Sequence, residues 1–279
     1  MAKIIIGVKM EIAILIIIFI LGTVFGSFYT LSTYRIPKKQ DIVHTRSYCP
    51  NCNHKLGFFD MFPILSYIFL GGKCRYCKQK ISPRYILLEV LSGLVFVLFF
   101  YLLKINLTDI KNIEWFKIYE FGFLSLYITF VFLMAGIDKE NKKIERKVSV
   151  YGIIISLIYI AYLCIVEKAN IYRYAIYIGL YLVAIILDII SLKKLNKSNY
   201  INGLVLTLIT MAIFTGELVS FITVGYTLLI SLLYVLIKKI KSFKLKQTNE
   251  ELFKKLNIGF FMGIANIITY IIINIFVIK

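Results

Sequence analysis

The chain has 279 residues, of which 59% are hydrophobic, and it carries 33 Lys and Arg against 15 Asp and Glu. Soluble globular domains are about 45–50% apolar, so this composition excludes an ordinary soluble protein. The net charge of +18 must therefore be distributed around hydrophobic segments, and its distribution decides what it means.

Eight hydrophobic segments are candidates for helices that cross a bilayer. Such a helix needs about 20 apolar residues to span a hydrocarbon core of roughly 30 Å, and its backbone must satisfy its own hydrogen bonds there. The first segment is followed by no A-x-A-like cleavage site, so it is interpreted as a retained helix rather than a signal peptide. The sequence therefore predicts an all-α polytopic membrane protein with about eight transmembrane helices, at approximately residues 11–32, 85–103, 119–137, 148–166, 171–191, 201–216, 219–237 and 258–278.

Basic residues are concentrated in every second loop. The segment between the first two hydrophobic segments has ten Lys or Arg against Asp41 and Asp60, and basic clusters follow the third, fifth and seventh segments. Because cytoplasmic loops carry the Lys and Arg excess, these loops are predicted to be cytoplasmic. The protein is then expected in the cytoplasmic (inner) membrane, with both termini on the outer side. Topology and contact with an anionic lipid bilayer account for the charge, so no nucleic-acid partner is expected.

Four of the five cysteines form two Cys-x-x-Cys pairs in the first basic loop, Cys49 with Cys52 and Cys74 with Cys77. Disulfides are disfavoured in the cytoplasm, and two such pairs about 20 residues apart are typical of a zinc-ribbon-like site. Four free thiols or a redox pair are the alternatives, and His54 could replace one thiolate ligand. Because four protein ligands leave no open position, the Zn²⁺ would be structural.

These patterns divide the chain into three predicted parts. Residues 1–32 form the first transmembrane helix, residues 33–84 a cytoplasmic four-cysteine zinc-binding insert, and residues 85–279 a seven-helix membrane domain.

The residues around the insert resemble those of type IV prepilin peptidases. GSFYTLSTYRIP, residues 26–37, is similar to the GSF…YR-P signature that ends the family's first helix, and the cysteine-bearing segment after it resembles the family's N-terminal domain nearly position for position. LNIGFFMGIAN, residues 256–266, is similar to the start of a later family helix, with Asn257 and Phe260 in place of two prolines.

The resemblance implies a membrane aspartyl peptidase that removes the basic leader of type IV prepilin or pseudopilin precursors on the cytoplasmic side. Many members of the family also N-methylate the new N-terminus with S-adenosylmethionine. Glu89 matches a glutamate of the family's second helix, and it is assigned to the N-terminal functions, including the methyl transfer.

The resemblance also implies two catalytic aspartates near cytoplasmic helix ends. One would take a proton from water while the other, protonated, donates to the peptide carbonyl. Asp138 matches the first, although Glu145 stands in place of the usual proline. The second belongs to a G-x-G-D-x-K motif, and the alignment places Asn202 at the aspartate and Leu204 at the lysine. An asparagine side chain neither takes up nor shares a proton at neutral pH.

Another acid could replace the second aspartate. Asp188 lies near the cytoplasmic end of the fifth hydrophobic segment, where an ionisable residue is a functional candidate. The alternative is that Lys193 or Lys194 neutralises it there. Glu140 and Glu145, in the loop that follows the third segment, are further stand-ins.

These features suggest three alternative functions. The first is a prepilin peptidase in which Asp138 works with Asp188 or another acid. The second is a degenerate paralogue that binds pilin precursors, assists pilus or secretion assembly, or retains only methyl transfer. The third is a transporter whose aspartates bind an ion or a proton, but no inverted repeat supports it and the cysteine insert has no role in it.

Overall fold

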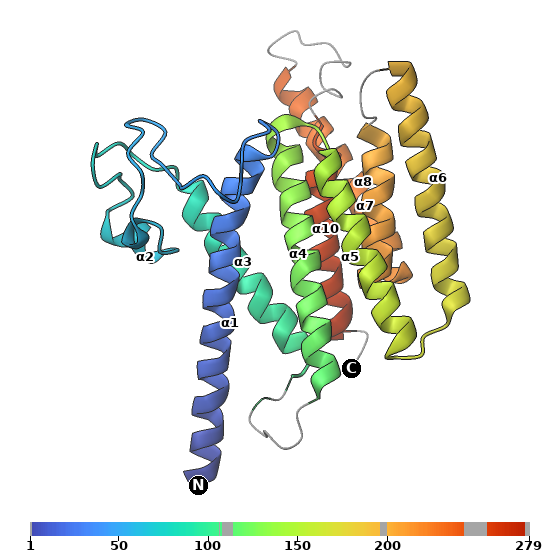
Figure 1. Ribbon diagram of the computed structural model, residues 1–279, viewed down its shortest axis with the longest axis horizontal. Coiled ribbons are helices and arrows are strands. Elements are labelled where there is room, and N and C mark those ends of the chain that lie inside the picture. The colour runs from blue at the N-terminus through green and yellow to red at the C-terminus, as the bar shows by residue number, and fades with distance from the viewer. Residues whose placement is uncertain (1, 106, 108–113, 196–199, 243–255, 277–279) are drawn as a thin grey trace. The chain divides into compact units, whose positions relative to one another are not determined.

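The computed structural model describes residues 2–105, 107, 114–195, 200–242 and 256–276. Within these residues the fold is all-α, and seven helices are long and apolar enough to cross a bilayer, with α7 a shorter apolar helix between them (Figure 1). This confirms the predicted fold class. The helices are α1 (Ala2–Arg35), α2 (Leu65–Phe69), α3 (Arg84–Leu102), α4 (Trp115–Asn141), α5 (Arg146–Ile165), α6 (Ile171–Leu195), α7 (Tyr200–Thr215), α8 (Glu217–Ser242) and α10 (Ile258–Phe276), with one 3-10 turn, η1 (Phe58–Asp60).

The chain divides into two compact units, residues 1–125 and residues 126–279. In the first unit α1 and α3 lie side by side because glycines remove side chains from their contact (Figure 1). A Cβ atom on Gly22 would lie 2.8 Å from the Cα atom of Gly93, and one on Gly26 would lie 2.7 Å from the Cα atom of Glu89. Small residues four apart on a membrane helix allow this close approach of two backbones.

The insert between α1 and α3 contains two copies of one hydrogen-bonded turn. In each copy the N–H of the first cysteine donates to the carbonyl five residues later, Cys49 to His54 at 3.0 Å and Cys74 to Gln79 at 2.9 Å. The residue after the second cysteine of each pair has a left-handed backbone, with φ of 55° at Asn53 and 57° at Lys78. The two copies therefore present their cysteines in the same local geometry.

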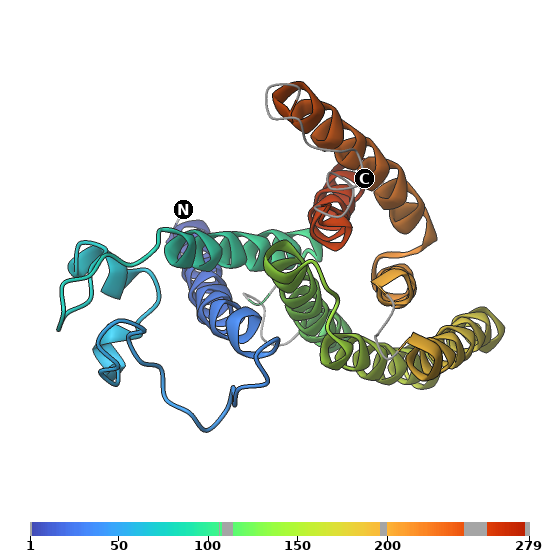
Figure 2. The same cartoon turned by 90° about the horizontal axis from the view of Figure 1, so that it is seen from above.

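In the second unit α7 is the central helix. It contacts α5, α6, α8 and α10, and Figure 2 shows it nearly end-on among its neighbours. A helix in contact with partners on several sides is expected to be apolar all round, which fits the composition of Tyr200–Thr215. The hydroxyls of its threonines donate hydrogen bonds to backbone carbonyls of the same helix, as Thr207 does to the Gly203 carbonyl at 2.8 Å.

A buried asparagine ties α10 to three other helices of this unit. Asn266 is 0% exposed, its Oδ1 accepts from the Tyr127 hydroxyl of α4 at 2.6 Å, and its Nδ2 donates to Thr215 and Thr223 of α7 and α8 at 3.3 and 3.2 Å. Because a polar group inside a bilayer has no water to bond, such a fully satisfied network fixes the helices that contribute to it.

Candidate functional site

The four cysteines of the insert converge on one point. Their Sγ atoms all lie within 4.8 Å of one another, and those of Cys49 and Cys77 are 3.8 Å apart. Tetrahedral zinc with Zn–S bonds of about 2.3 Å requires sulfur atoms about 3.8 Å apart. Among the described residues no His, Asp or Glu joins this group. The arrangement fits a Cys₄ zinc site, as the spacing predicted.

Backbone donors influence the metal-free thiols unequally. The N–H of Cys52 donates to Cys49 and, together with the N–H of Asn51, lowers the pKa of the Cys49 thiol to about 7 against the cost of desolvation. At Cys77 the N–H of Gln79 favours the thiolate, but desolvation and the neighbouring thiols outweigh it and raise the pKa to about 11. A bound cation would favour the thiolate form of all four cysteines.

The two turns are also joined by side chains outside the sulfur cluster. The His54 ring lies on the Tyr76 ring with centroids 3.5 Å apart, so it packs against the second turn. Asp60 pairs with Arg75, its Oδ1 lying 2.6 Å from Nε, and accepts from the Tyr76 hydroxyl at 3.3 Å. Desolvation opposes ionisation of Asp60, but Arg75, the Gly57 N–H and the Tyr76 hydroxyl together outweigh it and lower the pKa of the carboxyl. These contacts join the second turn to His54 and to η1 through groups other than the cysteines.

Glu89 connects α3 to the insert. Its Oε2 accepts from the backbone N–H of Ile64 at 2.8 Å, and the side chain is 8% exposed. Ile64 has φ 61° and ψ −53°, a conformation that is rare for a β-branched residue and costs about 1–3 kcal/mol. In this structure Glu89 therefore holds a strained turn, and its predicted part in methyl transfer stays a prediction.

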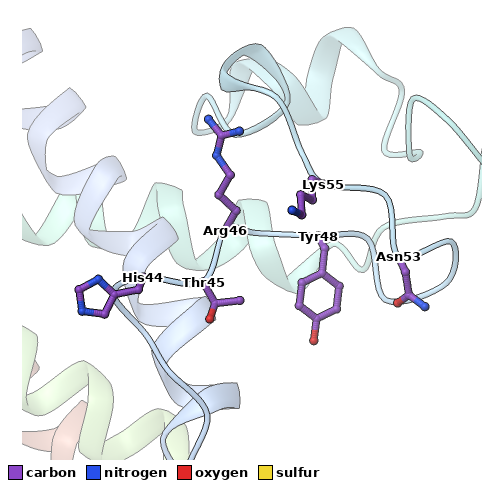
Figure 3. Close-up of a pocket in the computed structure, with 6 residues that line it drawn as sticks. All are labelled: His44, Thr45, Arg46, Tyr48, Asn53 and Lys55. Carbon is purple, nitrogen blue, oxygen red and sulfur yellow. The ribbon is translucent and has the colours of Figure 1, made fainter.

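A basic pocket of about 510 Å³ lies beside the first cysteine turn (Figure 3). No acid lines it, and Asp41, the nearest acid in sequence, accepts from the N–H groups of Val43 and His44 instead. The N–H of Val43 is the main cause of the lowered pKa of Asp41. The pocket is therefore suited to an anionic group. Its lining residues are His44, Thr45, Arg46, Tyr48, Asn53 and Lys55.

Asp138, in the second unit, lies in the last turn of α4 and is 0% exposed. Its Oδ2 accepts from the N–H of Phe260 in the first turn of α10 at 2.9 Å. Gly259 allows this approach, because a Cβ atom there would lie 3.2 Å from Oδ2. The α10 N-terminus has free amide N–H groups, and these stabilise a carboxylate placed against them.

Two residues missed by the sequence analysis complete this site. Asn257, noted only as a replaced proline, donates from Nδ2 to the Lys139 carbonyl at 2.8 Å and so ties the end of α4 to the start of α10. The Tyr200 hydroxyl lies beside the Asp138 carboxylate and accepts from the Gly259 N–H at 3.2 Å. The one signal for Tyr200 in the sequence is its place two residues before Asn202, in the segment aligned with the second aspartate motif.

The segment aligned with the second aspartate motif does begin near Asp138. Asn202 lies in the same first turn of α7 as Tyr200, half-buried, and its Nδ2 is buried with no hydrogen-bond partner among the described residues. Gly203 packs against Ile144, since a Cβ atom there would lie 2.8 Å from the Ile144 Cβ. This contact fixes the start of α7 against the turn that follows α4.

Asp188 is 7% exposed and forms an ion pair with Arg146, Oδ2 to Nε at 3.7 Å. No hydrogen bond or ion pair joins it to Asp138 within the described residues. The side chains of Lys193 and Lys194, its expected partners, lie outside those that the structure describes.

Two further acids, the stand-in Glu145 and the acid at the start of α8, have separate surroundings. Glu145 precedes α5 and pairs with Lys143 at 2.9 Å. Glu217, at the first residue of α8, accepts from Tyr177 and Arg173 at 2.9 and 3.1 Å.

Comparison with known proteins concerns the first unit. Residues 20–103 match the family model described as the bacterial peptidase A24 N-terminal domain. The N-terminal third carries this domain. Prepilin leader peptidase/N-methyltransferases are its curated relatives: that of Myxococcus xanthus is 43% identical over 81 residues, that of Vibrio cholerae 40% over 89, and that of Bacillus subtilis 40% over 80.

These alignments cover 29% of this chain and 24%, 35% and 32% of the three relatives. No solved structure matches the chain. The resemblance to type IV prepilin peptidases is therefore confirmed over residues 20–103, which include the C-terminal part of α1, the cysteine insert and α3.

Proposed function

We propose that this protein is a membrane aspartyl peptidase of the prepilin peptidase type. The observation that carries the proposal is the match of residues 20–103 to the peptidase A24 N-terminal domain, together with the Cys₄ cluster inside it. Its substrates would be type IV prepilin or pseudopilin precursors, bound from the bilayer and cut at the end of their basic leader.

Asp138 is the residue proposed to carry the chemistry. A carboxylate at the end of a membrane helix can take a proton from water as the water oxygen bonds to the scissile carbonyl carbon. The carboxyl then returns that proton to the leaving amine nitrogen as the C–N bond breaks. The proposed site lies on the cytoplasmic side, because the basic loops, including the insert, are assigned there.

Methyl transfer to the new N-terminus is proposed as a second activity of the first unit. The observation that favours it is the basic pocket of Figure 3. Arg46 and Lys55 are suited to the carboxylate of S-adenosylmethionine. When bound, that molecule would supply the methyl group, and the protein's residues would orient it.

A degenerate paralogue is the competing function. It is favoured by Asn202 at the place of the second aspartate and by the absence of any described contact between Asp138 and another carboxylate. Such a protein would bind pilin precursors, or assist their assembly, without cutting them.

One experiment separates these functions. The purified protein in detergent is incubated with a pilin precursor from the same source and isotopically labelled S-adenosylmethionine, beside Asp138→Ala and Asp188→Asn variants. The proposal expects leader release that Asp138→Ala abolishes, followed by labelling of the shortened pilin. Precursor binding without release by the unmodified protein would establish the non-cutting paralogue instead.

A further inference from the structure

The Tyr200 hydroxyl and the Asp138 carboxylate meet at the first turn of α10. The hydroxyl lies beside the carboxylate and accepts from the Gly259 N–H at 3.2 Å, and the next N–H, that of Phe260, donates to Asp138 Oδ2 at 2.9 Å. Three helices thus supply one compact cluster: α4 the carboxylate, α7 the hydroxyl and α10 the amide donors.

The two oxygens of the Asp138 carboxylate are unequal. Oδ2 accepts from Phe260, whereas Oδ1 is buried and accepts no hydrogen bond from any described residue. A buried carboxylate oxygen without a donor is costly, so such an atom calls for an explanation. A general base needs one anchored oxygen and one with a spare acceptor position, and Asp138 has this asymmetry.

Neither of the two residues first considered as the partner of Asp138 provides a second acid at this cluster. Asn202 cannot titrate, and Asp188 is paired with Arg146. The polar group that α7 brings to Asp138 is a phenol, which is neutral at pH 7 and donates one hydrogen bond.

We propose that Tyr200 is the positioning residue of Asp138 and takes the place of a second carboxylate in this protein. Its hydroxyl, with the Phe260 N–H, holds Asp138 as a single ionised base whose Oδ1 receives the proton of the attacking water. The inference rests on the proposed function only in naming leader cleavage as the reaction served. The contact itself can be tested without cleavage.

The first test compares Tyr200→Phe with Tyr181→Phe. Tyr181 is a matched control because it is also buried and also hydrogen-bonded, to Ser156 and Thr210 at 3.1 and 2.9 Å. Tyr200→Phe is expected to lower kcat/KM for leader cleavage about 10- to 100-fold. It should also move the acid limb of the pH profile upward, because a donor that favours the ionised carboxylate is gone. Tyr181→Phe should leave the limb in place.

The second test follows the Asp138 carboxyl directly. Dicyclohexylcarbodiimide modifies protonated carboxyl groups in membrane proteins, so the pH dependence of labelling at Asp138, read by mass spectrometry, reports its protonation. Tyr200→Phe should raise the pH of half-maximal labelling by about one unit, and Tyr181→Phe should not. Asp138→Asn should lose this labelling, because it lacks the carboxyl group, and this loss identifies Asp138 as the labelled residue.

Leader cleavage and carbodiimide labelling of Asp138 test different statements, so one can contradict its statement while the other supports its own. An unchanged labelling midpoint in Tyr200→Phe overturns the role of Tyr200, whether or not the protein cleaves its precursor. A raised midpoint in a protein that does not cleave would support the Tyr200–Asp138 pairing and refute the proposed peptidase function.

Discussion

At the scale of single residues, the cysteine cluster is the part of the molecule whose chemistry follows most directly from its geometry. Four Sγ atoms lie within 4.8 Å of one another, close enough to bind a single ion together. Removing one thiolate leaves three protein ligands, and structural zinc sites in proteins use four. Replacing even a solvent-exposed cysteine of the four should therefore weaken zinc binding measurably.

We expect Cys52→Ser to reduce the zinc content of the purified protein from about one ion per chain to less than half of that. Inductively coupled plasma mass spectrometry measures the ratio directly. Cys164→Ser is the matched control, because Cys164 lies in α5, outside the cluster. A full complement of zinc in Cys52→Ser would mean that the four thiolates do not act together.

The sequence predicted which four cysteines converge but not that Tyr200 and Asn257 lie at Asp138, and the difference is physical. The cysteines belong to two local turns whose spacing is characteristic, so the pattern along the chain is itself the geometry. Tyr200 reaches Asp138 only because α4, α7 and α10 pack together. The ion pair of Asp188 with Arg146 is likewise a contact between helices, which spacing within one helix cannot indicate.

At the scale of elements, the pairing of α1 with α3 depends on backbone contact at glycines. A methyl group on Gly22 would meet the Cα atom of Gly93 at 2.8 Å, and one on Gly26 would meet the Cα atom of Glu89 at 2.7 Å. A backbone atom cannot rotate out of the way as the end of a side chain can. The added methyl group would therefore force the two helices apart. Their separation would also disturb Glu89, which holds the turn at Ile64.

We expect Gly26→Ala to lower the free energy of unfolding by about 1–3 kcal/mol, the usual cost of overpacking. Gly122→Ala is the control, since Gly122 is a helical glycine with nothing within 4 Å of the added atom. There the gain in helix propensity should stabilise the protein by up to about 1 kcal/mol. Unfolding in mixed detergent micelles measures both, and equal effects would show that α1 and α3 do not pack through this glycine.

Hydrophobic length predicted the helices well, since each of the eight expected segments overlaps a helix of the structure. It could not show that α7, expected at 201–216, would be the central helix of its unit. An apolar segment faces lipid or protein equally well by composition, and α7 faces protein because its small residues admit close neighbours, as Gly203 admits Ile144. Packing partners are a property of several segments together.

At the scale of the whole molecule, the orientation in the membrane decides whether the proposed chemistry is possible. Leader cleavage on the cytoplasmic side requires the α4–α5 turn, next to Asp138, to face the cytoplasm. The basic loops predict this orientation, because Lys and Arg are retained on the cytoplasmic side. The α5–α6 turn, one helix later, must then face outward, as must the Glu217–Arg173 ion pair at the starts of α8 and α6.

Fusions to alkaline phosphatase and to green fluorescent protein measure this orientation, because the first is active only outside the cytoplasm and the second fluoresces only when folded inside. A phosphatase fused after Asn141 should be inactive and one fused after Glu167 active, and the fluorescent fusions should show the reverse. At each position the active fusion shows that the protein is expressed, so the inactivity of the other fusion reports location. The inverse pattern would place Asp138 and the cysteine insert outside, where a cytoplasmic leader could not reach them, and proteolysis by this site would be excluded whatever the state of its carboxylate.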